Sequence, residues 1–309
     1  MKILFQTCKF RQFPSHRNMS IKTFIFLDSE TTGLPFRESN KTRITELCFI
    51  AVQSDHISVG VFPRIQNKLH FCFNPRKFID PEASQVTGLT NELLEHQTEF
   101  DASCFNVMRE FLNVHRKPIC LVAHNGDRFD YPILKAEIYK TGNEMLDEVL
   151  CVDSLLAFRY LHDNVLKNDT PVEEEVASNA SVHLDDGFDD ILNNVVDNIE
   201  LQKCAKLTVE EIQKMNETTP IKKKTDYKFV KLAGVKRKIF VERPSFTLGN
   251  LYQRLTSKLP LDAHRAESDV NMLIECAAKV GQPFVDWCNS NAKRFCDIPM
   301  MVPGKPIGK

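Results

Sequence analysis

Residues Phe24–Pro35 read FIFLDSETTGLP, and this stretch decides the fold that we expect. Its opening apolar run is typical of a buried strand, and the run ends in two acids one residue apart, Asp28 and Glu30. Alternate residues of a strand face the same side, so the two carboxylates project together. Neighbouring carboxylates repel each other unless a cation lies between them, and Mg²⁺ prefers carboxylate and phosphate oxygens. The stretch therefore makes a phosphate-ester enzyme the first hypothesis, although the acid pair taken alone is more often a solvated strand end.

Composition sets wide limits on the class of protein. The chain has 309 residues, of which 42% are hydrophobic and 26% are charged, as is typical of soluble globular proteins of one large or two small domains. The formal net charge of −1 means that any basic surface for nucleic acid must be local. Ten cysteines without a CxxC pair indicate neither a zinc knuckle nor a redox motif, and favour a reduced intracellular compartment. No apolar run reaches membrane-spanning length.

Apolar runs and helical periodicity predict an α/β chain. Besides the first run, strands are predicted at 43–52, 60–63, 69–74, 118–123 and 149–154. Helices are predicted at 90–94 and 100–114, from Pro132 onward, at 248–255 and from Asp269 onward. Strands that alternate with helices imply a sheet with helices packed against it.

Charge changes sharply in the middle of the chain. Eleven acids lie within 163–200, and twelve lysines and arginines follow within 203–243. Charge blocks of low hydrophobicity predict a flexible insertion, either a regulatory or DNA-contacting loop or a solvated spacer. The predicted organisation is a basic flexible leader, the first part of a folded domain, the insertion, the second part of the domain and a flexible tail, at 1–21, 22–159, 160–243, 244–299 and 300–309.

The leader bears on localisation. The first 22 residues hold five basic residues and no acid, a composition similar to a mitochondrial presequence. Poor amphipathicity around Pro14 favours instead an unstructured leader, or translation that begins at Met19. We therefore expect the protein to be located in the nucleus, the cytoplasm or both, with mitochondrial targeting as the alternative.

Acids at three predicted junctions between elements carry the chemistry. Asp28 and Glu30 end a strand, Asp130 precedes a helix, and Asp269 begins a helix five residues after His264. Two metal ions held by several carboxylates stabilise both the attacking and the leaving oxygen of a phosphodiester displacement. Histidine suits proton removal from the attacking water because its pKa lies near working pH. Taken singly, Asp130 could be only a helix cap and Asp269 only a favourable first-turn acid.

Three motifs in order resemble those of DEDDh-type exonucleases, most closely the three-prime repair exonucleases. They are FLDSETTGLP at 26–35, AHNGDRFD at 123–130 and HRAESD at 264–269. The stretches SFTLG at 245–249 and FVDW at 284–287 are also similar to that family. Three ordered motifs are far more specific than any one alone.

The resemblance implies an RNase H-like exonuclease fold, with a mixed five-stranded sheet flanked by helices. It implies metal-dependent removal of nucleotides from DNA 3′ ends as nucleoside monophosphates, in DNA repair or in degradation of stray DNA. It also implies two Mg²⁺ ions, with Mn²⁺ as a substitute, bound by Asp28, Glu30, Asp130 and Asp269. His264 is then the general base.

The resemblance also implies how DNA 3′ ends, single-stranded or in frayed duplex, are bound. Leu34 and Val86 match positions that wedge against the terminal bases. Phe129 and Phe246 match positions that line the path of the strand, a role that tolerates sequence, although Phe246 could equally be core. Arg128 matches a DNA-contacting arginine, with a solvated loop residue as the alternative. The family forms homodimers through an edge strand, and no membrane partner is expected.

Two other functions share these motifs. An RNA 3′-end-trimming exonuclease uses the same chemistry and differs in its contacts to the 2′-hydroxyl. A catalytically inactive nucleic-acid-binding module is disfavoured, because buried carboxylates kept without metals cost stability. The chain departs from the family in its large insertion and in lacking both a proline-rich segment and a hydrophobic C-terminal anchor, so neither a proline-dependent partner nor membrane tethering is expected.

Overall fold

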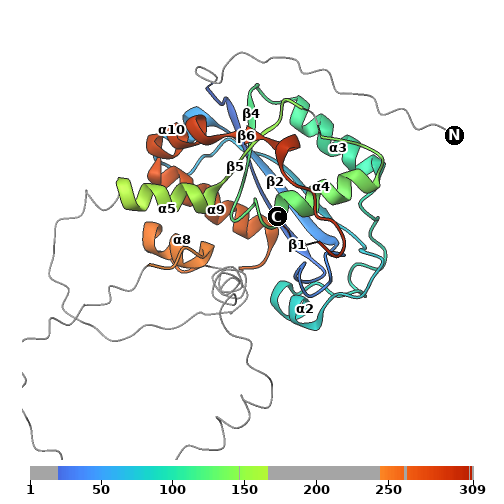
Figure 1. The fold of residues 1–309 in the computed structure, drawn as a ribbon. Coiled ribbons are helices and arrows are strands. Elements are labelled where there is room, and N and C mark those ends of the chain that lie inside the picture. The colour runs from blue at the N-terminus through green and yellow to red at the C-terminus, as the bar shows by residue number, and fades with distance from the viewer. Residues whose placement is uncertain (1–19, 146, 166–243, 261–262, 306, 308–309) are drawn as a thin grey trace, which may run out of the picture. The chain divides into compact units, whose positions relative to one another are not determined.

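Strand β1 (Thr23–Thr31) lies inside a six-stranded sheet with the order β3-β2-β1-β4-β5-β6 (Figure 1). In this computed structural model the described residues are 20–145, 147–165, 244–260, 263–305 and 307. Most of the predicted leader and insertion therefore lie outside the described residues. The chain divides into two units, Met1–Glu175 with Leu248–Lys309, and Val176–Thr247. The sheet and the helices named below belong to the first unit.

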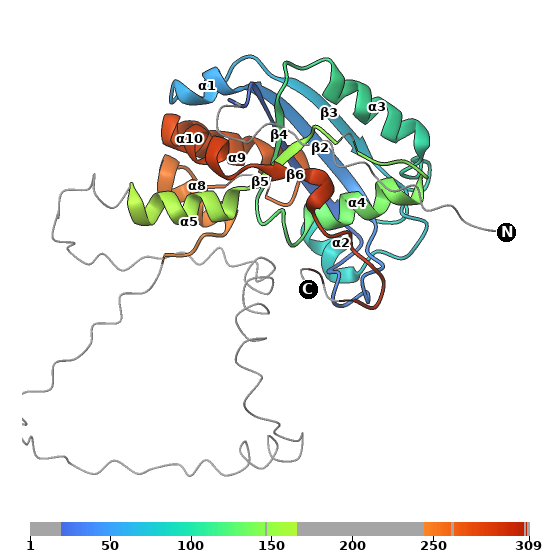
Figure 2. The ribbon, with the colours of Figure 1, turned by 45° about the horizontal axis from the view of Figure 1, so that its top comes forward.

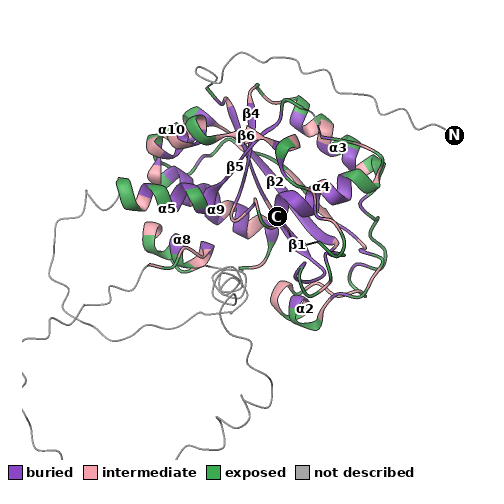
Figure 3. Ribbon diagram, in the orientation of Figure 1, coloured by how far each residue is buried: buried purple, intermediate pink, exposed green. Residues whose placement is uncertain are grey.

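The sheet is mixed, as the resemblance implied. Strand β1 pairs antiparallel with β2 (Ile44–Gln53), which pairs antiparallel with β3 (Asn67–Cys72). On its other side β1 pairs parallel with β4 (Ile119–Ala123), and β4 pairs parallel with β5 (Leu150–Asp153). Strands β4 and β5 are buried along their whole length (Figure 3), which is expected of parallel strands covered on both faces.

Two layers of helices enclose the sheet (Figure 2). On one side lie α5, α8, α9 and α10, at Ser154–Asn164, Leu248–Thr256, Ala266–Val280 and Gln282–Asn291. On the other side lie α3 (Ala102–Asn113) and α4 (Asp130–Lys140). The short helices α1 and α2 span Ser54–Ser58 and Pro81–Thr87. No helix among the described residues is long and apolar enough to cross a membrane.

Alternation along β1 assigns its side chains to the two layers. Ile25 and Leu27 belong to the core cluster that includes α3 and α4. Phe24 faces the opposite side, where its ring centroid lies 6.1 Å from that of Phe284 on α10. Because the side chains of a strand alternate with period two, Asp28 shares the face of Phe24. Both strand-end acids therefore point to the side that α9 covers.

The sixth strand corrects the expected count of five. It is β6 (Lys293–Arg294), a two-residue strand that pairs antiparallel with β5. The N–H of Phe295 donates to the carbonyl of Val149 (2.8 Å), and the Phe295 ring packs edge-on against Tyr131 at 5.8 Å between centroids. A charged dipeptide carries no strand pattern, so only this tertiary packing creates the strand.

Two predicted elements are wrong. The strand predicted at 60–63 is a turn and an irregular segment, because α1 follows β2 directly and Gly60 adopts a φ of 81°. The helix predicted at 90–94 is a series of turns. Its hydrogen bonds include those from the Leu94 N–H to the Thr90 carbonyl (3.2 Å) and from the Gln97 N–H to the Leu94 carbonyl (3.0 Å).

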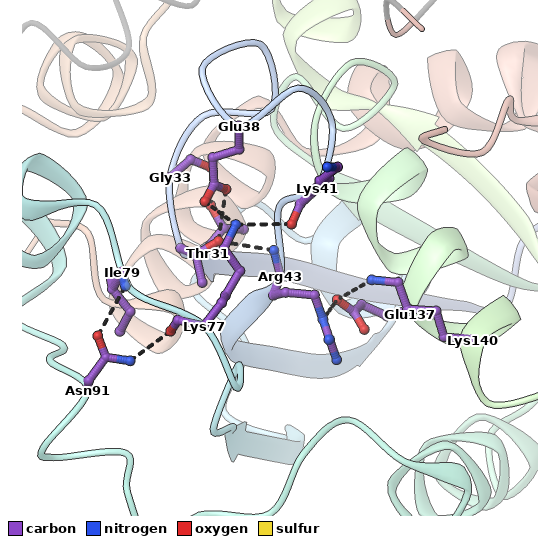
Figure 4. Close-up of polar contacts among 11 residues, drawn as sticks. Thr31, Gly33, Glu38, Lys41, Arg43, Lys77, Ile79, Asn91, Glu137 and Lys140 are labelled. Atoms are coloured by element: carbon purple, nitrogen blue, oxygen red, sulfur yellow. Dashed lines mark hydrogen bonds and ion pairs between the residues drawn. The ribbon is translucent and has the colours of Figure 1, made fainter. Parts of the chain in front are cut away.

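Polar contacts fix the loop that follows β1 (Figure 4). The Thr32 hydroxyl donates to Glu38 (2.8 Å), and Glu38 also pairs with Lys77. The Arg43 guanidinium donates to Glu137 on α4 (2.7 Å). The loop is thereby attached both to the segment before α2 and to the opposite helical layer, so the end of β1 has a defined position.

Candidate active site

The end of β1 supplies the first two acids of the site. Glu30 is 8% exposed, and Asp28 is partly exposed two residues earlier on the same face of the strand. A bulge between Glu30 and Thr31 interrupts the register with β2 at this point. Bulges re-aim side chains near functional sites, and here the shift follows directly after the buried acid.

The third acid begins helix α4. Asp130 is the first residue of α4 and is 3% exposed. Its carboxylate Oδ1 accepts a hydrogen bond from the Ser29 hydroxyl (2.7 Å). Ser29 lies between the two acids of β1, so this contact joins the second motif to the first and orients the Asp130 carboxylate.

The turn before α4 depends on a glycine. A Cβ atom on Gly126 would lie 2.7 Å from the Ala123 Cβ and 2.8 Å from Cε2 of Tyr131. The Tyr131 N–H donates to the Gly126 carbonyl (2.9 Å), and the Tyr131 hydroxyl donates to the carbonyl of Val152 on β5 (2.6 Å). The close approach of ring and turn holds Asp130, the preceding residue, at the carboxyl end of β4.

The fourth acid and the histidine come from the start of α9. Asp269 is 8% exposed, and its Oδ2 accepts the backbone N–H of His264 (2.9 Å). His264 adopts a φ of 64°, which is uncommon for a residue other than glycine and occurs often at functional sites. Ligand atoms of Glu30, His264 and Asp269 all lie within 4.8 Å of one another. The first and third motifs therefore meet.

Electrostatics favour a cation among these acids. The pKa of Glu30 is raised well above its ordinary value, first by burial, next by the charge of Asp269, and further by Glu46 and Asp130, whereas His264 opposes the shift. Burial is also the largest cause that raises the pKa of Asp130 to about 7, against the hydrogen bond from Ser29. A bound divalent ion offsets both the burial and the mutual repulsion of carboxylates. An all-oxygen carboxylate set fits a hard ion such as Mg²⁺.

Glu46 is a neighbour of the site that the sequence analysis missed. It pairs with Glu30 across β1 and β2, is 7% exposed, and accepts the backbone N–H of Ala266 through Oε2 (3.2 Å). Its Oε1 lies 2.7 Å from Nε2 of His70. An acid in the middle of the apolar run ITELCFIAV was a usable signal, because buried strands rarely carry unpaired charge. The apolar run indicates that Glu46 is buried, but it does not indicate that Glu46 lies opposite Glu30 in the sheet.

A cleft of about 650 Å³ lies beside this cluster. It is lined by Val86 on α2, by Ala263 and Arg265 on either side of His264, and by Glu46. Val86 is partly exposed. Val86, a predicted substrate-binding residue, therefore lines the same cleft as the two neighbours of His264, the predicted general base.

The other predicted substrate residues lie in different environments. Leu34 is 1% exposed, so contact with a base requires that its loop open. Arg128 is exposed in the turn before α4, and Phe129 is partly buried against the core. Phe246 belongs to the unit Val176–Thr247 and is partly exposed there.

Comparison with known proteins places this site in context. Residues 25–171 match the Exonuclease family model. The chain is 30% identical to three-prime repair exonuclease 1 of Bos taurus over 297 residues, which cover 91% of this chain and 71% of that protein. It is 37% identical to three prime repair exonuclease 2 of Homo sapiens over 150 residues, or 45% of this chain and 62% of that protein.

Solved structures show the same fold. Exonuclease I of E. coli in complex with a dT13 oligonucleotide aligns with a TM-score of 0.51 at 17% identity, over 84% of this chain and 41% of that chain. A second exonuclease I structure gives a TM-score of 0.52, also at 17% identity, over 87% of this chain and 43% of that one. This chain therefore spans less than half of exonuclease I. Sequence identity, extent of coverage and fold agree, and the chain belongs to the three-prime repair exonuclease family.

Proposed function

We propose that this protein is a divalent-metal-dependent exonuclease that removes nucleotides from the 3′ end of DNA. The observation that carries the proposal is the convergence of Glu30, Asp269 and His264, with ligand atoms within 4.8 Å of one another, beside the buried Asp130. The similarity to three-prime repair exonucleases supports the polarity and the type of reaction.

The carboxylates have the role of metal ligands. Asp28, Glu30, Asp130 and Asp269 would hold two Mg²⁺ ions, with Mn²⁺ as a substitute. When bound, these ions stabilise negative charge on the attacking and leaving oxygens of the phosphodiester. Ser29 fixes the Asp130 carboxylate by its hydrogen bond, so this ligand is oriented before any ion arrives.

His264 has the role of general base. Its imidazole belongs to the cluster with Glu30 and Asp269, whose negative charges stabilise the imidazolium that forms when the ring takes a proton from water. The hydrogen bond from the His264 backbone N–H to Asp269 fixes the backbone at His264 and does not involve the imidazole ring. The proposed general base, His264, and the proposed metal ligand Asp269 therefore lie next to each other at the start of α9.

The cleft has the role of substrate site. Its volume of about 650 Å³ is within the ordinary range for a small-molecule site and is large enough for a terminal nucleotide. Among the lining residues, Val86 offers apolar contact to a base and Arg265 offers a positive charge to a phosphate. An exonuclease I structure of the same fold holds a dT13 oligonucleotide, which supports a DNA 3′ end as the ligand.

We further propose a homodimer that forms through β3. This strand lies at one edge of the sheet and pairs only with β2 among the described residues. Its residues are exposed or partly exposed. An exposed edge is a template for a second strand. Light scattering during gel filtration tests this proposal: a mass of one chain of 35.5 kDa would contradict it.

The deciding experiment uses a single-stranded DNA labelled at its 5′ end and an RNA of the same sequence. We expect a ladder that shortens from the 3′ end on DNA with Mg²⁺, and none with EDTA. Asp269→Asn should lose the ladder while DNA binding persists, because metal ligation acts in the transition state. Asp286→Asn is the matched control, since Asp286 is an exposed acid on α10.

The other outcomes identify the alternatives. A ladder on RNA alone would assign the chain to RNA 3′-end trimming. Binding of DNA with no ladder, at any concentration of Mg²⁺ or Mn²⁺, would indicate an inactive nucleic-acid-binding module.

A further inference from the structure

A second cluster of metal-ligating side chains lies on β2 and β3. Glu46 on β2 pairs in register with Cys72 on β3, and His70 is two residues before Cys72. All three side chains therefore project from the same face of the sheet. Ligand atoms of Glu46, His70 and Cys72 lie within 4.8 Å of one another. We propose that these three residues bind a transition-metal ion of the zinc class.

The donor set selects the class of ion. An imidazole nitrogen, a thiolate sulfur and a carboxylate oxygen together suit Zn²⁺ and similar ions, whereas Mg²⁺ and Ca²⁺ prefer oxygen alone. This separates the cluster from the catalytic acids Asp28, Glu30, Asp130 and Asp269, which offer only oxygen. Two sites of different chemistry would thus lie on the same face of the sheet.

The spacing needs only a small adjustment. Zinc bonds of 2.0–2.3 Å in tetrahedral geometry separate neighbouring ligand atoms by roughly 3.3–3.8 Å. The 4.8 Å limit on the present separations is close to this range. His70 Nε2 and Glu46 Oε1, now 2.7 Å apart, would move apart by about 0.6 Å as the ion replaces their hydrogen bond.

Glu46 is positioned as a ligand by a second contact. Its Oε2 accepts the Ala266 N–H, which leaves Oε1 directed at His70. Ligands held by an outer partner lose less freedom when the metal binds. Glu46 is buried, whereas His70 is exposed and lines the same cleft of about 650 Å³. An ion can therefore enter from the cleft, and water can occupy the fourth position.

A proton competes with the ion at His70. Hydrogen bonds with Cys72 and then with Glu46 raise the pKa of His70 to about 10. A metal needs the neutral imidazole and the thiolate, so its binding releases protons and strengthens as pH rises.

The test is cobalt binding to the full-length, reduced protein in excess Mg²⁺. We expect one equivalent of Co²⁺ per chain to produce a sulfur-to-cobalt charge-transfer band, and Zn²⁺ to displace it. Cys72→Ser should lose the band, and His70→Asn should weaken Co²⁺ binding by at least about tenfold. Cys296→Ser is the matched control, because Cys296 is a partly exposed thiol outside the cluster.

The design isolates the cluster from the rest of the chain. Cys8 and Cys204 remain in every variant, so a band that they produced would persist in Cys72→Ser. An equal band in Cys72→Ser and wild type, or no band in wild type, would overturn the proposal. The readout is spectroscopic, so it stands whether or not DNA is cleaved. Cooperative urea unfolding of Cys72→Ser at the wild-type midpoint serves as the check that this variant is folded.

Discussion

At the scale of the residue, the site is a set of carboxylates that the fold forces together. Asp130 is 3% exposed and Glu30 is 8% exposed, and for both the largest cause of a raised pKa is burial. If such a carboxylate is protonated in the metal-free protein and ionised when a metal binds, the affinity for the metal depends on pH. The same groups make the stability of the metal-free protein depend on pH.

We predict that the metal-free protein loses stability as pH rises. The pKa of Asp130 rises from its ordinary 3.8 to about 7, so between these values the folded chain holds a proton that the unfolded chain releases. The free energy of unfolding then falls with rising pH, by on the order of 3 kcal/mol for this residue. Urea unfolding in EDTA at about pH 5 and about pH 8 measures the fall.

Two variants make this prediction specific. Asp130→Asn should have a flatter pH dependence than wild type, because the amide does not titrate. Asp286→Asn, which changes an exposed acid on α10, should follow wild type. Identical dependence in all three proteins would show that Asp130 does not titrate in this range.

We predict that Glu46→Gln weakens metal binding at the proposed site of Glu30 and Asp269. Glu46 faces Glu30 across the sheet and contributes to the negative potential there. Glutamine keeps an oxygen for the Ala266 N–H but removes the charge. Outer partners of metal ligands typically contribute about tenfold in affinity or activity. The concentration of Mg²⁺ for half-maximal cleavage should therefore rise about tenfold, with most of kcat recovered at saturation. An unchanged Mg²⁺ requirement would show that Glu46 has no electrostatic role.

The sequence predicted the acids of the site but not their neighbours. Asp28 and Glu30 were predicted from alternation along one strand, which is a local property. Ser29 as a donor to Asp130 and Glu46 opposite Glu30 depend on how separate elements pair. Strand register is a property of the folded sheet. Local sequence patterns therefore could not predict that Ser29 bonds with Asp130 or that Glu46 lies opposite Glu30.

At the scale of the element, buried charge joins β2 to α4. Arg43 precedes β2 and donates to Oε1 of Glu137 on α4 (2.7 Å), and the Lys140 ammonium lies 3.4 Å from the same oxygen. The Glu137 side chain is 1% exposed. Figure 4 shows both cations directed at this one carboxylate. The contact crosses from the loop after β1 to the helix that begins with Asp130.

We predict that Arg43→Ala lowers the free energy of unfolding by about 3 kcal/mol, because it leaves a buried carboxylate with only the partly exposed Lys140. The double variant Arg43→Met with Glu137→Leu should recover most of this loss, since apolar side chains of similar size often replace a buried pair without cost. Urea denaturation of the three proteins gives the comparison. A single variant as stable as wild type would mean that Lys140 alone neutralises Glu137.

Elements with strong periodic patterns were predicted within a few residues. The helix expected at 100–114 is α3, and the strand expected at 43–52 is β2. The failures at 60–63 and 90–94 are short segments, where one apolar run does not distinguish a strand or a helix from a turn. The two-residue β6 has no pattern at all and exists because Phe295 packs on Tyr131.

At the scale of the whole molecule, the fold is completed by segments far apart in the chain. Strands β1 to β5 and the first two motifs precede residue 165, whereas β6, Asp269 on α9 and the preceding His264 come from beyond residue 260. Helices α5 and α8 lie on the same side of the sheet (Figures 1 and 2). A connection between them has only to span that side, and lengthening a loop adds little to its closure entropy.

We therefore predict that residues 167–243 can be replaced by a glycine-serine linker of about 15 residues, whose mean reach is roughly 20 Å. The shortened protein should unfold cooperatively, since every core residue described above lies outside the replaced segment. It should also shorten single-stranded DNA from the 3′ end with Mg²⁺ within about threefold of the wild-type rate, a difference below 1 kcal/mol. The same replacement combined with Asp269→Asn should give no product, which excludes a contaminating nuclease.

Non-cooperative unfolding would place residues 167–243 in the core. Cooperative unfolding with lost cleavage would instead assign that segment to DNA binding, because the four candidate acids and His264 are unchanged in the shortened chain.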